Sequence, residues 1–184
     1  MTKHPNSLLF RSDVKTSDQE TISAILKSTK LFHDFEIDVA LELADSFLRE
    51  GEKSGYHFLL AELSGKTVGF AIFGPTPCTK SSWDLYWIAI LKNIQGNGLG
   101  TKLLEYAEQQ MIKKDARRCW IETSSQPSYS ATCRFYRRNG YSQQAQLNHF
   151  YDEDDHLLIF GKDLLHPEKK TTVTNTITNP SNPV

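Results

Sequence analysis

A chain of 184 residues and 21.0 kDa, with 39% hydrophobic and 11% aromatic residues, can bury the core of one domain, which excludes wholesale disorder. Its 21 basic and 22 acidic residues leave a net charge of −1, so nucleic acid and anionic membranes are not expected partners. No stretch approaches the roughly 18 apolar residues of a membrane span, and the first residues lack the apolar run of a signal peptide. Three cysteines without CxxC spacing favour a reducing compartment, so we expect a cytoplasmic protein.

The first part of the chain predicts a strand followed by two helices. Residues 8–12 are a short apolar run typical of a strand, and residues 17–20 provide capping residues before apolar positions at helical spacing. A second amphipathic helix ends at Gly51. Its apolar stripe recurs every four residues and consists of Val39, Leu43 and Phe47, with Ala40, Ala44 and Leu48 beside them.

A hairpin and a central strand are expected next. Residues 56–63 and 67–73 have strand-like composition and are separated by Ser64-Gly65-Lys66, which predicts a tight turn. Residues 83–90 are aromatic and β-branched, as in a central strand. Alternation along this strand predicts one face formed by Asp84, Tyr86, Ile88 and Ile90, and an opposite face formed by Trp83, Leu85, Trp87 and Ala89.

The last third predicts a helix, a strand, a shorter helix and a final hairpin. The first helix is expected at residues 99–114, with an apolar stripe of Leu99, Leu103, Ala107 and Met111, and the strand at 119–123. The shorter helix is expected to begin at Pro127 and to end in a left-handed cap at Asn139-Gly140. The two strands of the hairpin are expected at 141–151 and 156–164, around an acidic turn at 152–155. Alternating strands and helices predict a mixed α/β sheet with helices on both faces. We expect one domain over residues 1–165 and a disordered tail over 166–184, which is rich in Thr, Asn and Pro.

The most informative segment is a glycine loop between the central strand and the long helix. Residues 95–101 read Gln-Gly-Asn-Gly-Leu-Gly-Thr and lead directly into that helix. Glycines permit positive φ and close approach to a ligand, while the first amides of a helix carry partial positive charge. The loop therefore predicts a binding site for a pyrophosphate group. An ordinary strand-to-helix turn that needs glycines for packing is the alternative.

Two nucleotide-binding motifs do not fit this loop. A Walker loop ends in Gly-Lys-Ser/Thr, whereas Gly100 is followed by Thr101 and then Lys102. The dinucleotide fingerprint GxGxxG requires a third glycine where this chain has Thr101 or Leu103. These mismatches disfavour nucleotide triphosphatases and NAD-binding proteins.

Two segments resemble motifs of the GNAT superfamily of N-acetyltransferases. Gln95-x-x-Gly98-x-Gly100 resembles the family's acyl-coenzyme A loop, and Tyr136-Arg137-Arg138-Asn139-Gly140-Tyr141 resembles its Y-x-x-x-G-F/Y segment. The likeness extends in element order over roughly residues 8–164. It implies an α/β fold with a mixed sheet that is splayed between the fourth and fifth strands, where the acyl-pantetheine arm of acetyl-CoA is inserted.

The resemblance also implies cofactor contacts. Ile88, Ala89 and Ile90 would offer backbone groups to the pantetheine arm. The pyrophosphate would be held by the main-chain amides of Gln95, Gly96, Asn97, Gly98, Leu99, Gly100 and Thr101. The family often has an asparagine seven residues before the motif tyrosine, and this chain has Tyr129 at that position.

Acyl transfer from a thioester to an amine needs a neutral amine, stabilisation of an oxyanion and a proton for the departing thiolate. Tyr136 matches the family's tyrosine near the cofactor sulfur and is the predicted acid, with core packing as the alternative for this residue. Asp84 matches the position of a glutamate base in histone-acetyltransferase-type members. Its carboxylate is one methylene shorter, so a water relay would be needed. Glu122 on the next strand is the second candidate for the general base. The alternative for Asp84 is a solvent-exposed residue at the start of its strand, without a catalytic role.

The remaining chemistry-bearing residues indicate no other site. The six histidines have no short metal-ligand spacing, so no metal is expected. There is no GxSxG elbow, and Cys133 is interpreted as packing. The sequence thus predicts an acetyl-CoA-dependent N-acetyltransferase acting on a small-molecule or peptide amine, with a homodimer as an expected assembly. A catalytically silent acyl-CoA sensor or interaction module on the same fold is the alternative.

Overall fold

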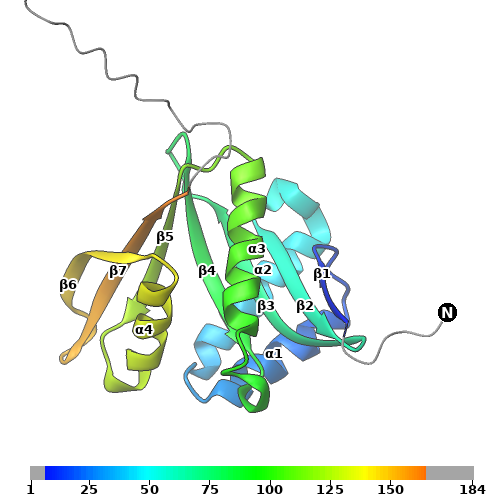
Figure 1. Cartoon of the computed structure of the whole chain (residues 1–184), viewed down its shortest axis with the longest axis horizontal. Coiled ribbons are helices and arrows are strands. Elements are labelled where there is room, and N and C mark those ends of the chain that lie inside the picture. Colours follow the sequence, from blue (N-terminus) through cyan, green and yellow to red (C-terminus); the bar gives the residue numbers. More distant parts are fainter. Residues whose placement is uncertain (1–6, 165–184) are drawn as a thin grey trace, which may run out of the picture.

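Seven strands form one mixed sheet in the order β1-β2-β3-β4-β5-β7-β6 (Figure 1). The structure is a computed structural model and describes residues 7–164, so the tail predicted at 166–184 lies outside the described residues. The strands are β1 (Leu8–Arg11), β2 (His57–Leu63), β3 (Lys66–Pro75), β4 (Ser82–Ile90), β5 (Arg118–Ser124), β6 (Ser142–Asp152) and β7 (Asp155–Asp163). β4 and β5 are parallel, whereas the other neighbouring strands are antiparallel.

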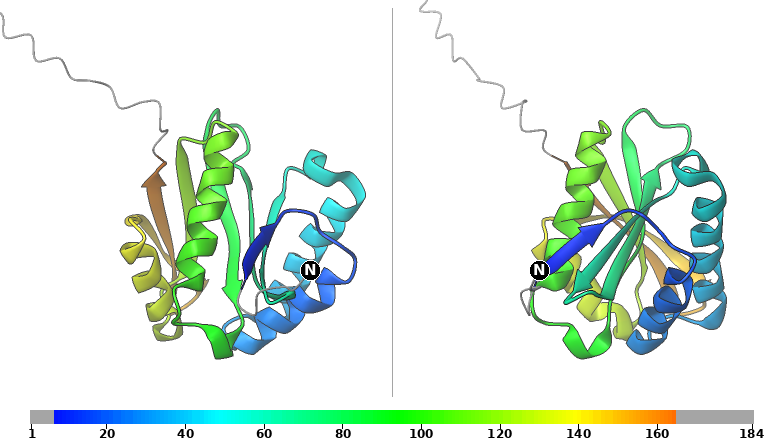
Figure 2. Two further views of the ribbon diagram at one scale, coloured as in Figure 1. Left: turned by 45° about the vertical axis from the view of Figure 1, so that its right-hand side comes forward. Right: turned by 90° about the vertical axis from the view of Figure 1, so that its right-hand side faces the viewer.

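Helices cover both faces of the sheet, as predicted (Figure 2). The helical elements are α1 (Asp18–Thr29), α2 (Asp34–Glu50), α3 (Leu99–Lys113) and α4 (Ser130–Arg138), with short 3-10 turns η1 (Gly51–Ser54), η2 (Lys92–Ile94) and η3 (Pro127–Tyr129). α1 and α2 pack on one face, and α3 and α4 pack on the other. Within residues 7–164, no helix is both long and apolar enough to cross a bilayer.

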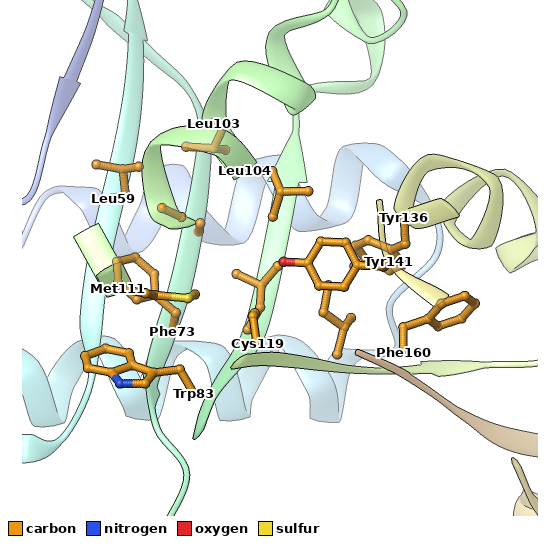
Figure 3. Packing of buried hydrophobic residues seen from close by; sticks show 14 of the residues in the cluster. Leu59, Phe73, Trp83, Leu103, Leu104, Met111, Cys119, Tyr136, Tyr141 and Phe160 are labelled. Atoms are coloured by element: carbon orange, nitrogen blue, oxygen red, sulfur yellow. The ribbon is translucent and has the colours of Figure 1, made fainter. Parts of the chain in front are cut away.

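The core on the α3 side follows the predicted helical stripe. Leu99, Leu103, Ala107 and Met111 are all buried in it. Figure 3 shows this cluster, with Trp83 and Met111 at one end and Tyr136, Tyr141 and Phe160 at the other. Because these residues recur every three to four positions, one face of α3 meets the sheet along its whole length.

The buried stripe of α2 differs from the predicted one. Ile37, Ala40 and Ala44 are buried, while Val39 is 42% exposed and Leu43 and Phe47 are partly buried. The helix is rotated relative to the predicted stripe, so that Ala40 and Ala44, which were expected beside that stripe, are fully buried. Apolar spacing alone cannot distinguish these two rotations, because both stripes have helical period.

Of the capping residues predicted at 17–20, Asp18 and not Ser17 makes the polar contacts at the start of the first helix. Ser17 precedes α1 but makes no capping hydrogen bond. Asp18 is buried instead, and its carboxylate accepts hydrogen bonds from Arg11 at 2.8 and 2.5 Å and from the Lys15 amide at 2.7 Å. A contact with β1 therefore fixes the start of α1.

A buried polar network connects α3 to the end of the sheet. Lys162 on β7 donates to both carboxylate oxygens of Glu108 at 2.8 and 2.7 Å, and the Tyr141 hydroxyl donates to Glu108 at 2.9 Å. Glu108 is only 8% exposed. A carboxylate in this position is tolerated because a cation and a hydroxyl both satisfy it.

Replacing Glu108 by leucine is expected to destabilise the protein by about 2–3 kcal/mol, because Lys162 and Tyr141 would lose their shared partner. Urea denaturation followed by circular dichroism would measure the change. Glu105→Leu is the matched control, since Glu105 lies on the same helix but is exposed. Equal stability of the two variants would contradict a structural role for the network.

Candidate active site

β4 and β5 are hydrogen-bonded neighbours only at their first residues. Their ladder consists of three pairs, Ser82–Arg118, Trp83–Cys119 and Asp84–Trp120. Beyond these pairs β5 continues to pair with β7 up to Ser124, so β4 and β5 separate towards their carboxyl ends (Figure 1). We call the separated stretch, residues 85–90 of β4 and 121–124 of β5, the β4–β5 opening. It is the splay that the sequence motifs predicted.

A β-bulge in β4 changes which side chains share a face. Ile72 and Phe73 are adjacent in β3, yet they pair with Trp87 and Leu85, which leaves Tyr86 as an extra residue. Ile88 and Ile90 consequently contact the α3-side core together with Trp83 and Leu85. Tyr86, Trp87 and Ala89 contact the α1-side core. The predicted alternation along β4 is therefore wrong beyond the bulge, because one extra residue inverts the sides.

The predicted glycine loop leads from the end of β4 into α3. Gly98 is the N-cap of α3 with φ of 74°, and Gly96 has φ of 86°. A Cβ atom at either position would meet no heavy atom within 4 Å. The loop backbone is thus open on its outer side, and no side chain caps α3.

These features fit a bound diphosphate. The first amides of an α-helix lack intrahelical acceptors and carry the positive end of the helix dipole. Uncapped amides beside an open glycine backbone can approach phosphate oxygens without steric conflict. The acyl-CoA contacts predicted at residues 95–101 stay predictions, but the local geometry is compatible with each main-chain contact.

Two polar side chains of the loop turn back onto the protein. The Gln95 amide donates to the carbonyl of Ile90 at 2.9 Å, and the Asn97 amide donates to the carbonyl of Ile94 at 3.3 Å. A Cβ at Gly100 would lie 3.4 Å from the ring of Phe135, so this glycine permits close contact between α3 and α4. The side chains thus fix the loop, which leaves ligand binding to the backbone.

Tyr136 lies on α4 beside the α3-side core. It is 6% exposed, and its ring packs against Phe135, Tyr141 and Phe160 at centroid distances of 5.5 to 6.0 Å. Burial raises the pKa of the Tyr136 phenol above its ordinary value. The phenol is therefore protonated at neutral pH and can act only as a proton donor until it has given up its proton.

The two predicted base candidates lie on neighbouring strands. Asp84 pairs with Trp120, and Glu122 follows two residues later on β5, which places Glu122 on the same side as Trp120. Burial raises the pKa of Asp84, and burial together with the nearby Asp84 charge raises the pKa of Glu122. Neither carboxylate forms an ion pair with a cation of residues 7–164. The arrangement leaves two acidic groups unneutralised beside the β4–β5 opening.

Some tyrosines near these carboxylates were not identified as site residues from the sequence. Tyr86, the bulged residue, contacts Tyr56 edge-on at 5.7 Å, and burial raises its pKa to about 12. Tyr151 on β6 is 48% exposed, and burial followed by the charge of Glu122 raises its pKa to about 12. No sequence signal locates them, because their proximity depends on the bulge and on the long β6–β7 hairpin. The described residues contain no cluster of three His, Cys, Asp or Glu side chains suited to a metal.

A family profile gives the class of this protein. The profile described as the Acetyltransferase (GNAT) family matches residues 21–141, which include β2 to β5, the glycine loop and Tyr136. The chain belongs to the GNAT acetyltransferase family. The predicted family, mixed fold and enzyme class are thereby confirmed.

Solved structures agree with this assignment. A GNAT-family protein from Desulfovibrio desulfuricans is 36% identical and superimposes with a TM-score of 0.84, covering 86% of this acetyltransferase and 100% of the other chain. The ribosomal-protein-S18-alanine N-acetyltransferase of Escherichia coli is 18% identical, with a TM-score of 0.68 and coverage of 89% and 98%. The PaiA N-acetyltransferase of Thermoplasma acidophilum, solved with coenzyme A, is 19% identical, with a TM-score of 0.66 and coverage of 85% and 99%. No curated protein matches the sequence of this GNAT acetyltransferase.

Proposed function

We propose that this acetyltransferase moves the acetyl group of acetyl-CoA to a primary amine by direct attack in a ternary complex. The acceptor is a small metabolite or a peptide amine. The observation that carries the proposal is the pair Asp84 and Glu122 beside the β4–β5 opening, two carboxylates without a cationic partner among the described residues. An uncompensated acidic pair attracts a protonated amine and can then accept its proton.

Backbone groups of the chain would hold acetyl-CoA. Main-chain amides of residues 95–101 bind the diphosphate, and the unpaired edge of β4 at Ile88, Ala89 and Ile90 offers backbone groups to the arm. The thioester supplies an activated acetyl carbonyl. Tyr129 was predicted as a further cofactor contact; its hydroxyl donates to the carbonyl of Leu31, so a contact with the arm would use the ring.

Proton transfers complete the reaction. A carboxylate, Asp84 through a water molecule or Glu122, removes the proton of the amine. The amine nitrogen bonds to the acetyl carbon, and the bond between that carbon and sulfur breaks. The Tyr136 phenol gives its proton to the departing thiolate. The attacking nitrogen then releases its second proton, which restores the phenol directly or through solvent. The products are the N-acetylated amine and coenzyme A, and no acyl-enzyme is formed.

Asp84→Asn is expected to lower the transfer rate about 100-fold near neutral pH, because general base catalysis contributes about 10²–10⁴-fold. The loss should shrink at high pH, where the amine is already neutral. In the wild type, the raised pKa of Asp84 means that the base is lost as pH falls through that pKa. A thiol-release assay over a panel of amines at several pH values measures the profile.

Glu122→Gln is the matched variant in that assay. An unchanged profile in Asp84→Asn with a shifted profile in Glu122→Gln would assign the base to Glu122. Unchanged profiles in both variants would refute carboxylate base catalysis. Tight acetyl-CoA binding without turnover on any amine would instead support the silent sensor.

Cytoplasmic location and a homodimer are further parts of the proposal. β6 is the edge of the sheet, and all of its residues are exposed. Residues 142–151 of β6 carry no Asp, Glu, Lys or Arg to discourage strand pairing. The solution mass from light scattering would decide the assembly.

A further inference from the structure

The carboxyl end of α1 is attached to both sides of the β4–β5 opening. The amide of Lys92, directly after β4, donates to the Ser28 hydroxyl at 3.2 Å. The hydroxyl of Tyr129, shortly after β5, donates to the carbonyl of Leu31 at 2.8 Å. The segment between these two contacts therefore spans the separated ends of the two strands at the lower edge of the sheet (Figure 1).

The segment that carries Tyr129 is itself fixed to β7. The Ser124 hydroxyl donates to the carboxylate of Asp155 at 2.5 Å and accepts from the Gln126 amide at 3.0 Å. The His156 amide donates to the Ser125 hydroxyl at 2.8 Å. The loop that carries Tyr129 is thus held by several hydrogen bonds, which fix the position of the Tyr129 hydroxyl.

The α1 side of the contact is also ordered locally. The Thr29 hydroxyl donates to the carbonyl of Leu26 at 2.7 Å and accepts from the Leu31 amide at 3.2 Å. Lys30 closes the helix with φ of 58°. After the helix ends, the hydrogen bond from Tyr129 connects Leu31 to the segment that follows β5.

We propose that residues 28–33 form a strap across the wide end of the β4–β5 opening, and that Tyr129 is the positioning residue that latches this strap. The proposal rests on the acetyl transfer proposed above, because its consequence concerns the thioester arm. The strap closes the opening on the side of α1, at the carboxyl ends of β4 and β5. Its position therefore sets how an amine reaches the thioester and how far water is excluded from it.

Two features favour a latch over a direct role of the hydroxyl in cofactor binding. The only proton of the Tyr129 phenol is already donated to Leu31, so the group has no donor left for an amide carbonyl of the arm. Burial raises the pKa of this phenol to about 12, so the donor is retained throughout the working pH range. The tyrosine at the family's asparagine position thus points to a different task.

A loosened strap should admit water as a competing nucleophile. In that side reaction the water oxygen bonds to the acetyl carbon and the bond between carbon and sulfur breaks. The thiolate takes up a proton, and a second proton is released with acetate. Thiol is then released without an amine, which is a readout that a purely structural role of Tyr129 would not change.

Tyr129→Phe removes the latch and keeps the ring. Hydrogen exchange of the free protein, followed by mass spectrometry, should show exchange at residues 28–33 about fivefold faster, the change expected from loss of one hydrogen bond. In kinetic assays, the KM for the amine and the rate of thiol release without amine should each rise about fivefold, while the KM for acetyl-CoA stays unchanged. Tyr106→Phe is the control, since its ring stacks on Phe10 away from the opening.

Distinct outcomes would overturn the proposal. Unchanged exchange at residues 28–33 in Tyr129→Phe would show that no latch exists. A raised KM for acetyl-CoA with unchanged thiol release in the absence of amine would assign the hydroxyl to the cofactor. If the wild-type protein transferred no acetyl group, the proposed function would fail, and the exchange measurement would still decide whether Tyr129 holds the strap.

Discussion

Tyr136→Phe is expected to reduce kcat for acetyl transfer by about 100-fold, the lower end of the range for a positioned general acid. The Tyr136 ring packs against the rings of Phe135, Tyr141 and Phe160, and burial keeps its hydroxyl protonated. Phenylalanine preserves this packing and removes only the proton donor. The thiolate would then have to leave unprotonated or wait for a proton from water. A stopped assay of thiol release at saturating amine and acetyl-CoA gives kcat directly.

The effect should fall on kcat and not on binding. The KM values for both substrates are expected to stay within about twofold, because a proton donated only in the transition state adds nothing to ground-state affinity. Tyr106→Phe controls for loss of a phenol elsewhere in the fold. An unchanged kcat in Tyr136→Phe would contradict the role of general acid and would leave Tyr136 as a packing residue of the core.

Gly98→Asp is expected to weaken binding of coenzyme A by more than about tenfold. It would place a carboxylate at the N-terminus of α3, where the helix dipole favours an anion. The new side chain could cap the free amides itself, so it would compete with a diphosphate both sterically and by charge repulsion. Isothermal calorimetry with coenzyme A measures the loss.

The chain offers a close control for the backbone strain of this substitution. Gly55 has φ of 82° and ψ of −4°, Gly98 has φ of 74° and ψ of 0°, and a Cβ has free space at both. Gly55→Asp should therefore cost a similar amount of folding energy, about 1 kcal/mol, without changing coenzyme A affinity. Equal affinity of wild type and Gly98→Asp would show that the α3 N-terminus does not hold the diphosphate.

The sequence was most informative where a feature depends on neighbouring residues. The stripe of α3, the left-handed Gly140 after α4 and the hairpin turn at Ser64-Gly65, where both residues have positive φ, all occur as predicted. Each depends on backbone geometry or side-chain spacing within one turn or one helix. The same holds for the glycine loop, because a strand, glycines and a helix N-terminus follow one another directly.

The errors occur where a distant partner decides the outcome. The sides of β4 are inverted by a bulge that exists only relative to β3, and the rotation of α2 depends on how its alanines meet the sheet. Among the capping residues predicted at 17–20, Asp18 makes the contacts and Ser17 does not, because Arg11 of β1 lies beside Asp18. In each case the local sequence was compatible with two arrangements, and a contact with another element selected one of them.

The order of residues alone determined the family and located the glycine loop and Tyr136, for which we propose roles in diphosphate binding and proton donation. Contiguous glycines and motif spacing are properties of a short stretch of chain. The tertiary structure decided the grouping of Asp84 with Glu122 and the bond from Tyr129 to Leu31, whose partners are 98 positions apart. Such pairs form only after the strand register and the helix packing are fixed. Their geometry therefore depends on long-range contacts that no local pattern encodes.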